Sequence, residues 1–154
     1  MHTSPHQAEI LLVEDNPGDV LLTKEMFARA HISNMLHVAR DGEMALAMLK
    51  QEGQYMQQPR PDLVLLDLNL PRLDGREVLA EMKRQEHLRH IPVVILTGSR
   101  MERDITKVFG IPEQCYMTKP ITIDKLAKVL NVLGENFCFS LMVPAISRTT
   151  QVPA

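Results

Sequence analysis

Short apolar runs alternate along the chain with longer segments in which apolar residues recur every three or four positions. Runs of the first kind are typical of strands buried on both faces of a parallel sheet, and segments of the second kind are typical of helices. The pattern predicts strands at residues 10–13, 35–39, 63–66, 93–96 and 115–118. It predicts helices at about 16–30, 44–49, 75–84, 100–109 and 123–134.

Five strands alternating with five helices predict an α/β fold. Strand–helix–strand connections are right-handed, so the helices are expected to cover both faces of a doubly wound, five-stranded parallel sheet, (βα)5. The apolar side of the first helix is expected to consist of Leu21, Leu22, Met26 and Phe27. Residues 52–61 contain three glutamines and two prolines without periodicity, which predicts a surface loop.

Composition narrows the kind of protein that carries this fold. The 154 residues are 45% hydrophobic and 23% charged, which suits one compact domain with an ordinary core. A net charge of -2 supplies no general attraction to nucleic acid, so direct nucleic-acid binding is not expected. Two cysteines suit a reducing compartment, and no run approaches the roughly 20 apolar residues of a membrane helix. A cytoplasmic protein that does not enter the membrane is therefore predicted.

Polar residues with useful chemistry stand at the ends of four predicted strands. Glu14 and Asp15 follow the first strand, Asp67 ends the third, Thr97 follows the fourth and Lys119 follows the fifth. The carboxyl ends of parallel strands lie at one edge of the sheet, where ligands bind in open α/β folds. Taken singly, each residue also suits a structural role as a turn former, a helix cap or a surface lysine. Their joint occurrence favours a single site.

The three acids are of the type that binds a hard divalent cation. Mg²⁺ or Mn²⁺ takes oxygen ligands, which Glu14, Asp15 and Asp67 would supply, and the backbone carbonyl of Asn69 would add another. A carboxylate is a poor nucleophile toward phosphorus unless the charge of the phosphoryl group is neutralised. A metal ion together with Lys119 would neutralise that charge. The combination predicts phosphoryl transfer to Asp67.

Four motifs carry a resemblance to a known family. They are ILLVEDN at 10–16, LLDLNLP at 65–71 followed by Asp74-Gly75, VILT at 94–97 and YMTKP at 116–120. With these motifs the chain resembles the receiver domain of two-component response regulators over about residues 9–133. The resemblance implies a flavodoxin-like fold with strand order 2-1-3-4-5. It also implies that Asp67 is the phosphoacceptor and that Glu14 and Asp15 are the acidic pair of the metal site.

The resemblance implies roles for residues at the fourth and fifth strands as well. Thr97 matches the switch hydroxyl that moves toward the phosphoryl group, and Lys119 matches the lysine that binds this group. Tyr116 matches the switch aromatic, whose inward turn changes the surface of the fourth helix, fifth strand and fifth helix. The bond between Lys119 and Pro120 matches one that is usually cis in the family.

Two longer stretches are similar to a particular subfamily. EDNPGDV at 14–20 and LNLPRLDGREV at 68–78 resemble the single-domain regulators paired with bacterial phytochrome histidine kinases. This resemblance implies a sensor histidine kinase as the partner and red or far-red light as the signal. The same features occur in other small receivers, so a different kinase stays open at this point.

The chain is expected to divide into an N-terminal extension at 1–8, a receiver domain at 9–134 and an arm without an output domain at 135–154. Residues 137–143 are unusually apolar for a free tail. Val129 and Val132 are expected to widen the apolar face of the last helix. Together these features predict a homodimer formed through the last helix and the arm, which would pack either on its own domain or across the dimer.

Two other functions are possible for these residues. A small-molecule phosphatase with an aspartyl-phosphate intermediate normally has a second acid two residues after the nucleophile, where this chain has Asn69. A degenerate receiver that only binds a partner would lack an acid, the acceptor or the lysine, and none is missing. We therefore expect a signalling protein that catalyses only its own phosphoryl uptake and loss.

Overall fold

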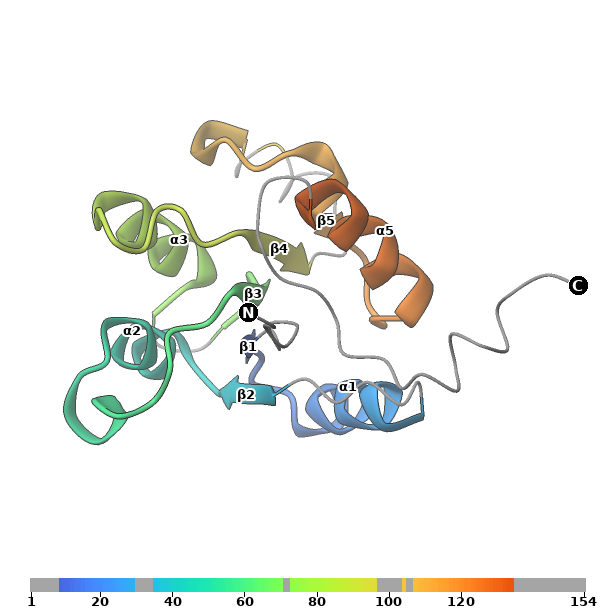
Figure 1. Cartoon of the computed structure of the whole chain (residues 1–154), viewed down its shortest axis with the longest axis horizontal. Coiled ribbons are helices and arrows are strands. Elements are labelled where there is room, and N and C mark those ends of the chain that lie inside the picture. Colours follow the sequence, from blue (N-terminus) through green and yellow to red (C-terminus); the bar gives the residue numbers. More distant parts are fainter. Residues whose placement is uncertain (1–8, 30–34, 71–72, 97–103, 105–106, 135–154) are drawn as a thin grey trace, which may run out of the picture.

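A five-stranded parallel sheet forms the centre of the structure (Figure 1). The computed structural model describes residues 9–29, 35–70, 73–96, 104 and 107–134. The strands are β1 (Glu9–Val13), β2 (Met35–Ala39), β3 (Leu63–Asp67), β4 (Val93–Leu96) and β5 (Tyr116–Met117). Their order in the sheet is β2-β1-β3-β4-β5, which confirms the order that the resemblance implies.

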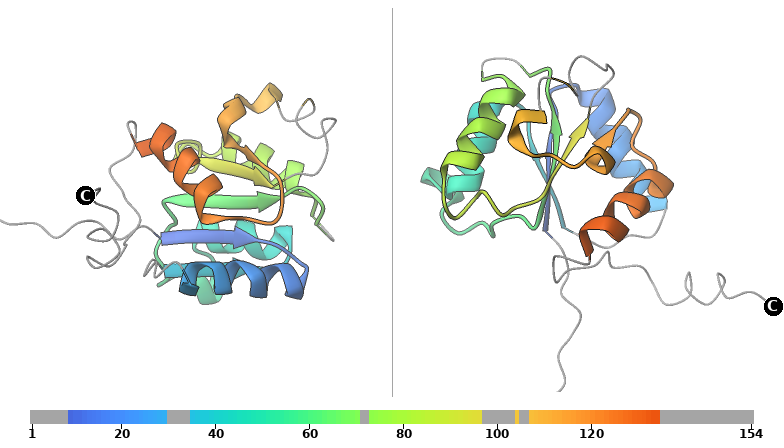
Figure 2. Two further views of the ribbon diagram at one scale, coloured as in Figure 1. Left: turned by 90° about the vertical axis from the view of Figure 1, so that its right-hand side faces the viewer. Right: turned by 90° about the horizontal axis from the view of Figure 1, so that it is seen from above.

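Helices cover both faces of the sheet. The α-helices of the described ranges are α1 (Pro17–Arg29), α2 (Gly42–Lys50), α3 (Gly75–Arg84) and α5 (Ile123–Gly134). Helices α1 and α5 lie on one face, and α2 and α3 lie on the other (Figure 2). Each connection carries the chain from the end of one strand back to the start of the next parallel strand. The strands therefore all end at one edge of the sheet, and the described α-helices begin near that edge.

The central strands are buried on both faces. All residues of β3 and β4 are buried, and residues 10–13 of β1 are at most 1% exposed. This burial explains why these strands consist of continuous apolar runs rather than of alternating apolar and polar residues. Val13 pairs with Leu66, and Asp67 pairs with Leu96. The register therefore fixes which side chains emerge at the carboxyl edge.

The side of helix α1 that faces the core is not the side that carries Leu21 and Leu22. Its buried residues are Val20, Thr23 and Phe27, which recur at the spacing of one helix face. Leu21 and Leu22 are 57% and 54% exposed, so the prediction that they face the core is wrong. The helix places them next to the buried stripe, on the side that the sheet does not cover.

Several predicted boundaries differ from the observed ones. Strand β5 has two residues, because residues 113–115 form a 3-10 helix (Glu113–Cys115) immediately before it. Another 3-10 helix, Gly53–Tyr55, interrupts the predicted loop at 52–61. Of the helix predicted at 100–109, Lys107–Phe109 forms a 3-10 helix, and most of the remainder lies outside the described residues.

The last helix contributes to the core of its own domain. Val129 is 4% exposed, so it is not available for the exposed apolar face that the sequence predicts on α5. The side chain of Val132 and the arm at 135–154 lie outside the described residues. Among the described helices, none is both long enough and apolar enough to cross a membrane.

Candidate functional site

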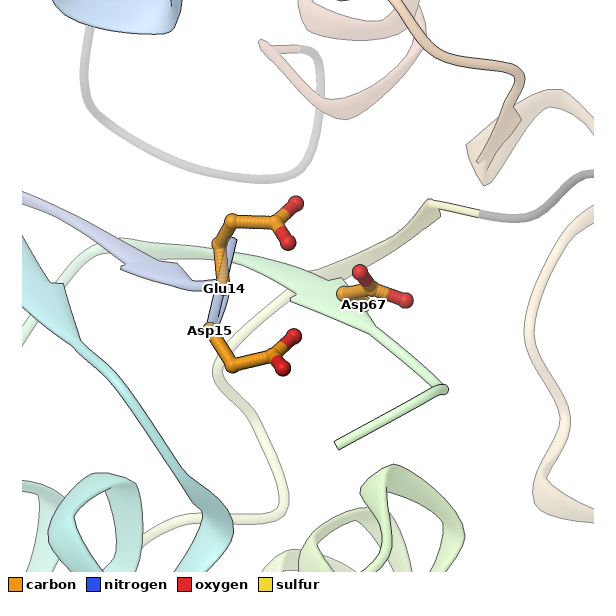
Figure 3. A group of neighbouring side chains, drawn as sticks. All are labelled: Glu14, Asp15 and Asp67. Carbon is orange, nitrogen blue, oxygen red and sulfur yellow. The ribbon is translucent and has the colours of Figure 1, made fainter. Parts of the chain in front are cut away.

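Three carboxylates meet at the carboxyl edge of the sheet (Figure 3). Glu14 and Asp15 directly follow β1, and Asp67 ends the neighbouring strand β3. Val13 pairs with Leu66 in parallel, so the residues that follow them emerge side by side. One oxygen from each of the three carboxylates lies within 4.8 Å of the others. The structure thus brings together the three acids that the sequence places at strand ends.

The ammonium group of Lys119 lies among these carboxylates. The residue comes shortly after β5, and its peptide bond to Pro120 is cis. Its Nζ donates hydrogen bonds to Oδ2 of Asp67 at 2.9 Å, to Oε1 of Glu14 at 3.1 Å and to Oδ2 of Asp19 at 3.0 Å. The first, third and fifth strands therefore all deliver a charged group to one site.

Asp19 was not predicted as a site residue. It lies in the first turn of α1, in a segment whose residue types suggest only the entry into a helix. Its contact with Lys119 joins two residues that are 100 positions apart in the chain. The sequence signal that could have identified Asp19 is its position four residues after Asp15. The first turn of α1 begins at the edge of the sheet where Asp15 lies.

Asp67 is held from two sides. Its Oδ1 accepts a hydrogen bond from the backbone N–H of Asn69 at 2.9 Å, while its Oδ2 faces Lys119. The residue is 4% exposed. Gly75 permits this tight β3–α3 connection, because a Cβ there would lie 2.7 Å from both the carbonyl oxygen of Asp67 and the Cα of Leu68.

Burial and close charges perturb the pKa values of the site. Burial raises the pKa of Glu14 from 4.5 to about 7, although its hydrogen bond with Lys119 works in the opposite direction. Burial also disfavours the charged form of Lys119. The hydrogen bonds to Asp67, Asp19 and Glu14 outweigh that effect and raise the pKa of Lys119 above its usual value. The lysine is therefore a permanent cation, whereas Glu14 changes its charge near neutral pH.

The remaining predicted site residues are placed as follows. Tyr116 is a buried residue of β5, where it pairs with Ile95 of β4. Asn69 is exposed at the start of the β3–α3 connection. Thr97, the predicted switch hydroxyl, lies outside the described residues.

Comparison with known proteins identifies the family. Residues 10–131 match the response regulator receiver domain, and this range includes both the acids and the lysine. The chain belongs to the response regulator receiver family. Such receivers are signalling proteins, and signalling that depends on phosphorylation is consistent with the buried Asp67 of this one and with the Lys119 ammonium beside it.

Among the relatives of this receiver is the response regulator Rcp1 of Synechocystis sp., which is 43% identical over 136 residues, or 88% of this chain and 92% of Rcp1. The solved structure of the bacteriophytochrome response regulator AtBRR is 41% identical, with a TM-score of 0.78 over 90% of this chain and 99% of that one. The phosphorylated cyanobacterial phytochrome response regulator RcpA is 42% identical, with a TM-score of 0.68 over 88% and 99% of the two chains.

The three carboxylates of this receiver fit a divalent metal ion. A solved structure of Rcp1, 41% identical to this receiver over 89% of the chain and 99% of Rcp1, with a TM-score of 0.67, is a Mn²⁺-bound form. Hard divalent cations take carboxylate oxygens, and Glu14, Asp15 and Asp67 offer one oxygen each within 4.8 Å of the others. Lys119 also contacts Glu14 and Asp67, so the lysine and a metal ion would together neutralise the negative charge of the carboxylates.

Proposed function

We propose that Asp67 accepts a phosphoryl group from a phosphohistidine of a sensor histidine kinase, and that the chain signals through a surface that changes as a result. The observation that carries this proposal is the buried carboxylate of Asp67, whose Oδ2 lies 2.9 Å from Lys119 Nζ, next to Glu14 and Asp15. Phosphoryl transfer consists mainly of positioning and of neutralising charge, and these residues are suited to both.

In the proposed reaction, a carboxylate oxygen of Asp67 forms a bond to phosphorus while the bond between phosphorus and the histidine nitrogen breaks. The electron pair of that bond stays on the imidazole nitrogen. Lys119 would pair with a phosphoryl oxygen in place of its contact with Asp67 Oδ2, and we assign Thr97 and Tyr116 the roles of switch hydroxyl and switch aromatic. Mg²⁺ held by Glu14, Asp15, Asp67 and the Asn69 carbonyl would neutralise charge on the phosphoryl oxygens.

Phosphorylation with a small donor tests the acceptor. The protein, Asp67→Asn and Asp124→Asn are incubated with acetyl phosphate and Mg²⁺, and acid-labile phosphate is measured by intact mass. Asp124 is an exposed aspartate in the first turn of α5, so its variant controls for the loss of one carboxylate. We expect phosphate on the unaltered chain and on Asp124→Asn but not on Asp67→Asn. Equal labelling of all three proteins would disprove the assignment.

The same proposal makes a phytochrome histidine kinase the partner and the cytoplasm the location. Similarity to RcpA, AtBRR and Rcp1 supports this proposal. The exposed Leu21 and Leu22 of α1 give a kinase an apolar surface to contact. Leu22 also lines a small hollow together with Glu14, Asp19 and Lys119, so this surface adjoins the acceptor.

We further propose a homodimer formed through α5 and the apolar segment at 137–143 of the arm. Since Val129 is buried, the support comes from the composition of the arm rather than from that residue. The division into an extension at 1–8, a receiver at 9–134 and an arm at 135–154 is part of the same proposal. Light scattering after size exclusion, on the full chain and on a truncation after Gly134, tests the proposed homodimer. Monomers in both samples would disprove it.

A further inference from the structure

The ammonium of Lys119 uses all of its hydrogen-bond donors. A lysine ammonium has three N–H groups, and the carboxylates of Glu14, Asp19 and Asp67 each accept one at 2.9–3.1 Å. The three acceptors differ in exposure, since the side chains of Glu14 and Asp67 are 2% and 5% exposed and that of Asp19 is 34% exposed. Asp19 is therefore the outer of the three contacts.

The position of Asp19 is fixed by its helix rather than by the lysine. Its backbone N–H donates to Oδ1 of Asn16 at 3.1 Å, and its carbonyl oxygen accepts from the hydroxyl of Thr23 at 3.0 Å. Val20 donates its N–H to the carbonyl of Asn16 at 3.0 Å, which starts the helical hydrogen bonds of α1. The carboxylate thus projects from an anchored first turn toward the site.

The chemistry at the site affects the three partners of Lys119 differently. Once Asp67 forms an ester with phosphorus, the contact of its Oδ2 with the lysine must change. Glu14 belongs to the group of carboxylates that fits the metal ion, so its charge is shared with that ion. Asp19 belongs neither to the acceptor nor to that group, and it is the partner that is free to hold the lysine before and after transfer.

We propose that Asp19 is a positioning residue that keeps the ammonium of Lys119 directed at the phosphoryl site throughout the reaction. This inference rests on the proposed function of Asp67. Lysine has a long, flexible side chain with considerable rotamer entropy, so the loss of one of three contacts allows the ammonium to move toward solvent. The phosphoryl oxygens are then neutralised less well in the transition state.

The test compares Asp19→Ala, Asp19→Asn and Glu25→Gln. Asparagine keeps an oxygen that accepts from Lys119 but removes the charge, whereas alanine removes both. Glu25 lies exposed on the same helix, so its variant controls for the loss of one negative charge from α1. The rate of phosphoryl uptake is measured with saturating acetyl phosphate and Mg²⁺. In parallel, the ¹H–¹⁵N signal of the Lys119 NH₃⁺ group is followed by NMR at low temperature, in the absence of any phosphodonor.

We expect uptake about three- to tenfold slower in Asp19→Ala, as for the loss of one partly exposed charged hydrogen bond. Asp19→Asn should lose less than Asp19→Ala, and Glu25→Gln should match the unaltered chain. The Lys119 NH₃⁺ signal should broaden through faster exchange with water in Asp19→Ala and stay sharp in Glu25→Gln.

Equal uptake rates in Asp19→Ala and Glu25→Gln would overturn the inference, and so would equal losses in the alanine and asparagine variants. An unchanged NH₃⁺ signal in Asp19→Ala would also overturn it. If the unaltered chain takes up no phosphate, the proposed function fails instead, and the NMR comparison still decides whether Asp19 holds the lysine.

Discussion

Replacing Glu14 with glutamine is expected to change how the stability of the metal-free protein depends on pH. Glu14 is 1% exposed, and burial raises its pKa from 4.5 to about 7. Because the folded-state pKa is the higher one, the folded protein keeps this proton between the two values while the unfolded chain releases it. The stability contributed by the protonated group is complete below pH 4.5 and is lost as pH rises through about 7.

The difference between the two pKa values sets the size of the effect. Raising the pKa from 4.5 to about 7 corresponds to about 3 kcal/mol, at about 1.4 kcal/mol per pKa unit. The hydrogen bond from Lys119 to Glu14 favours the charged form of Glu14 and opposes the effect of burial. Between pH 5 and pH 8.5, we therefore expect the unaltered chain to lose about 1–2 kcal/mol more unfolding free energy than Glu14→Gln.

Urea unfolding in the presence of EDTA, followed by far-UV circular dichroism at both pH values, measures this difference. Glu52→Gln is the matched control, because Glu52 is an exposed glutamate outside the site and should leave the pH dependence unchanged. If Glu14→Gln and the unaltered chain lose the same unfolding free energy between pH 5 and pH 8.5, burial does not control the ionisation of Glu14. That result would refute the link between the burial of Glu14 and its raised pKa.

Three further variants probe the surroundings of the site. Gly75→Ala should lower the unfolding free energy by about 1–3 kcal/mol in urea, because its Cβ would meet backbone atoms of Asp67 and Leu68 at 2.7 Å, and an unchanged value would argue against this tight contact. Asp74→Ala removes the side-chain cap of α3, where the carboxylate accepts from the backbone N–H of Arg76 at 2.7 Å, and should cost about 1 kcal/mol in thermal unfolding. Leu21→Asp should slow transfer from a histidine kinase but not from acetyl phosphate, because Leu21 is exposed on α1. Equal slowing with both donors would contradict a docking role.

Most of the sheet could be predicted from the sequence because its strands are buried on both faces. Strand β3 was predicted to within one residue, since a short apolar run between two prolines suits a buried strand much better than a helix. Strand β5 was predicted too long, because its pairing partner β4 and the preceding 3-10 helix limit it to two residues. The orientation of α1 was predicted incorrectly at Leu21 and Leu22, since hydrophobicity alone does not show which side of a helix the sheet covers.

The convergence of Glu14, Asp15, Asp67 and Lys119 could be predicted because parallel strands end at one edge. The hydrogen bond from Lys119 to Asp19 could not be predicted in the same way. It depends on the direction of a first helical turn relative to a side chain from a distant strand end, and neither residue alone contains that information. The switch roles of Tyr116 and Thr97 are predictions from motif resemblance.

The parallel register of β1 and β3 also determines where this chain tolerates changes of length during evolution. Side chains alternate along a strand, so one residue inserted within β3 would shift its side chains by one position and turn Asp67 away from Glu14. The segment at 51–62 enters β3 at the opposite end, about 16 Å from the acceptor for a strand of five residues. Insertions and deletions in lineages that keep the chemistry should therefore accumulate in that segment and be rare in the strands and in the short turns that follow them.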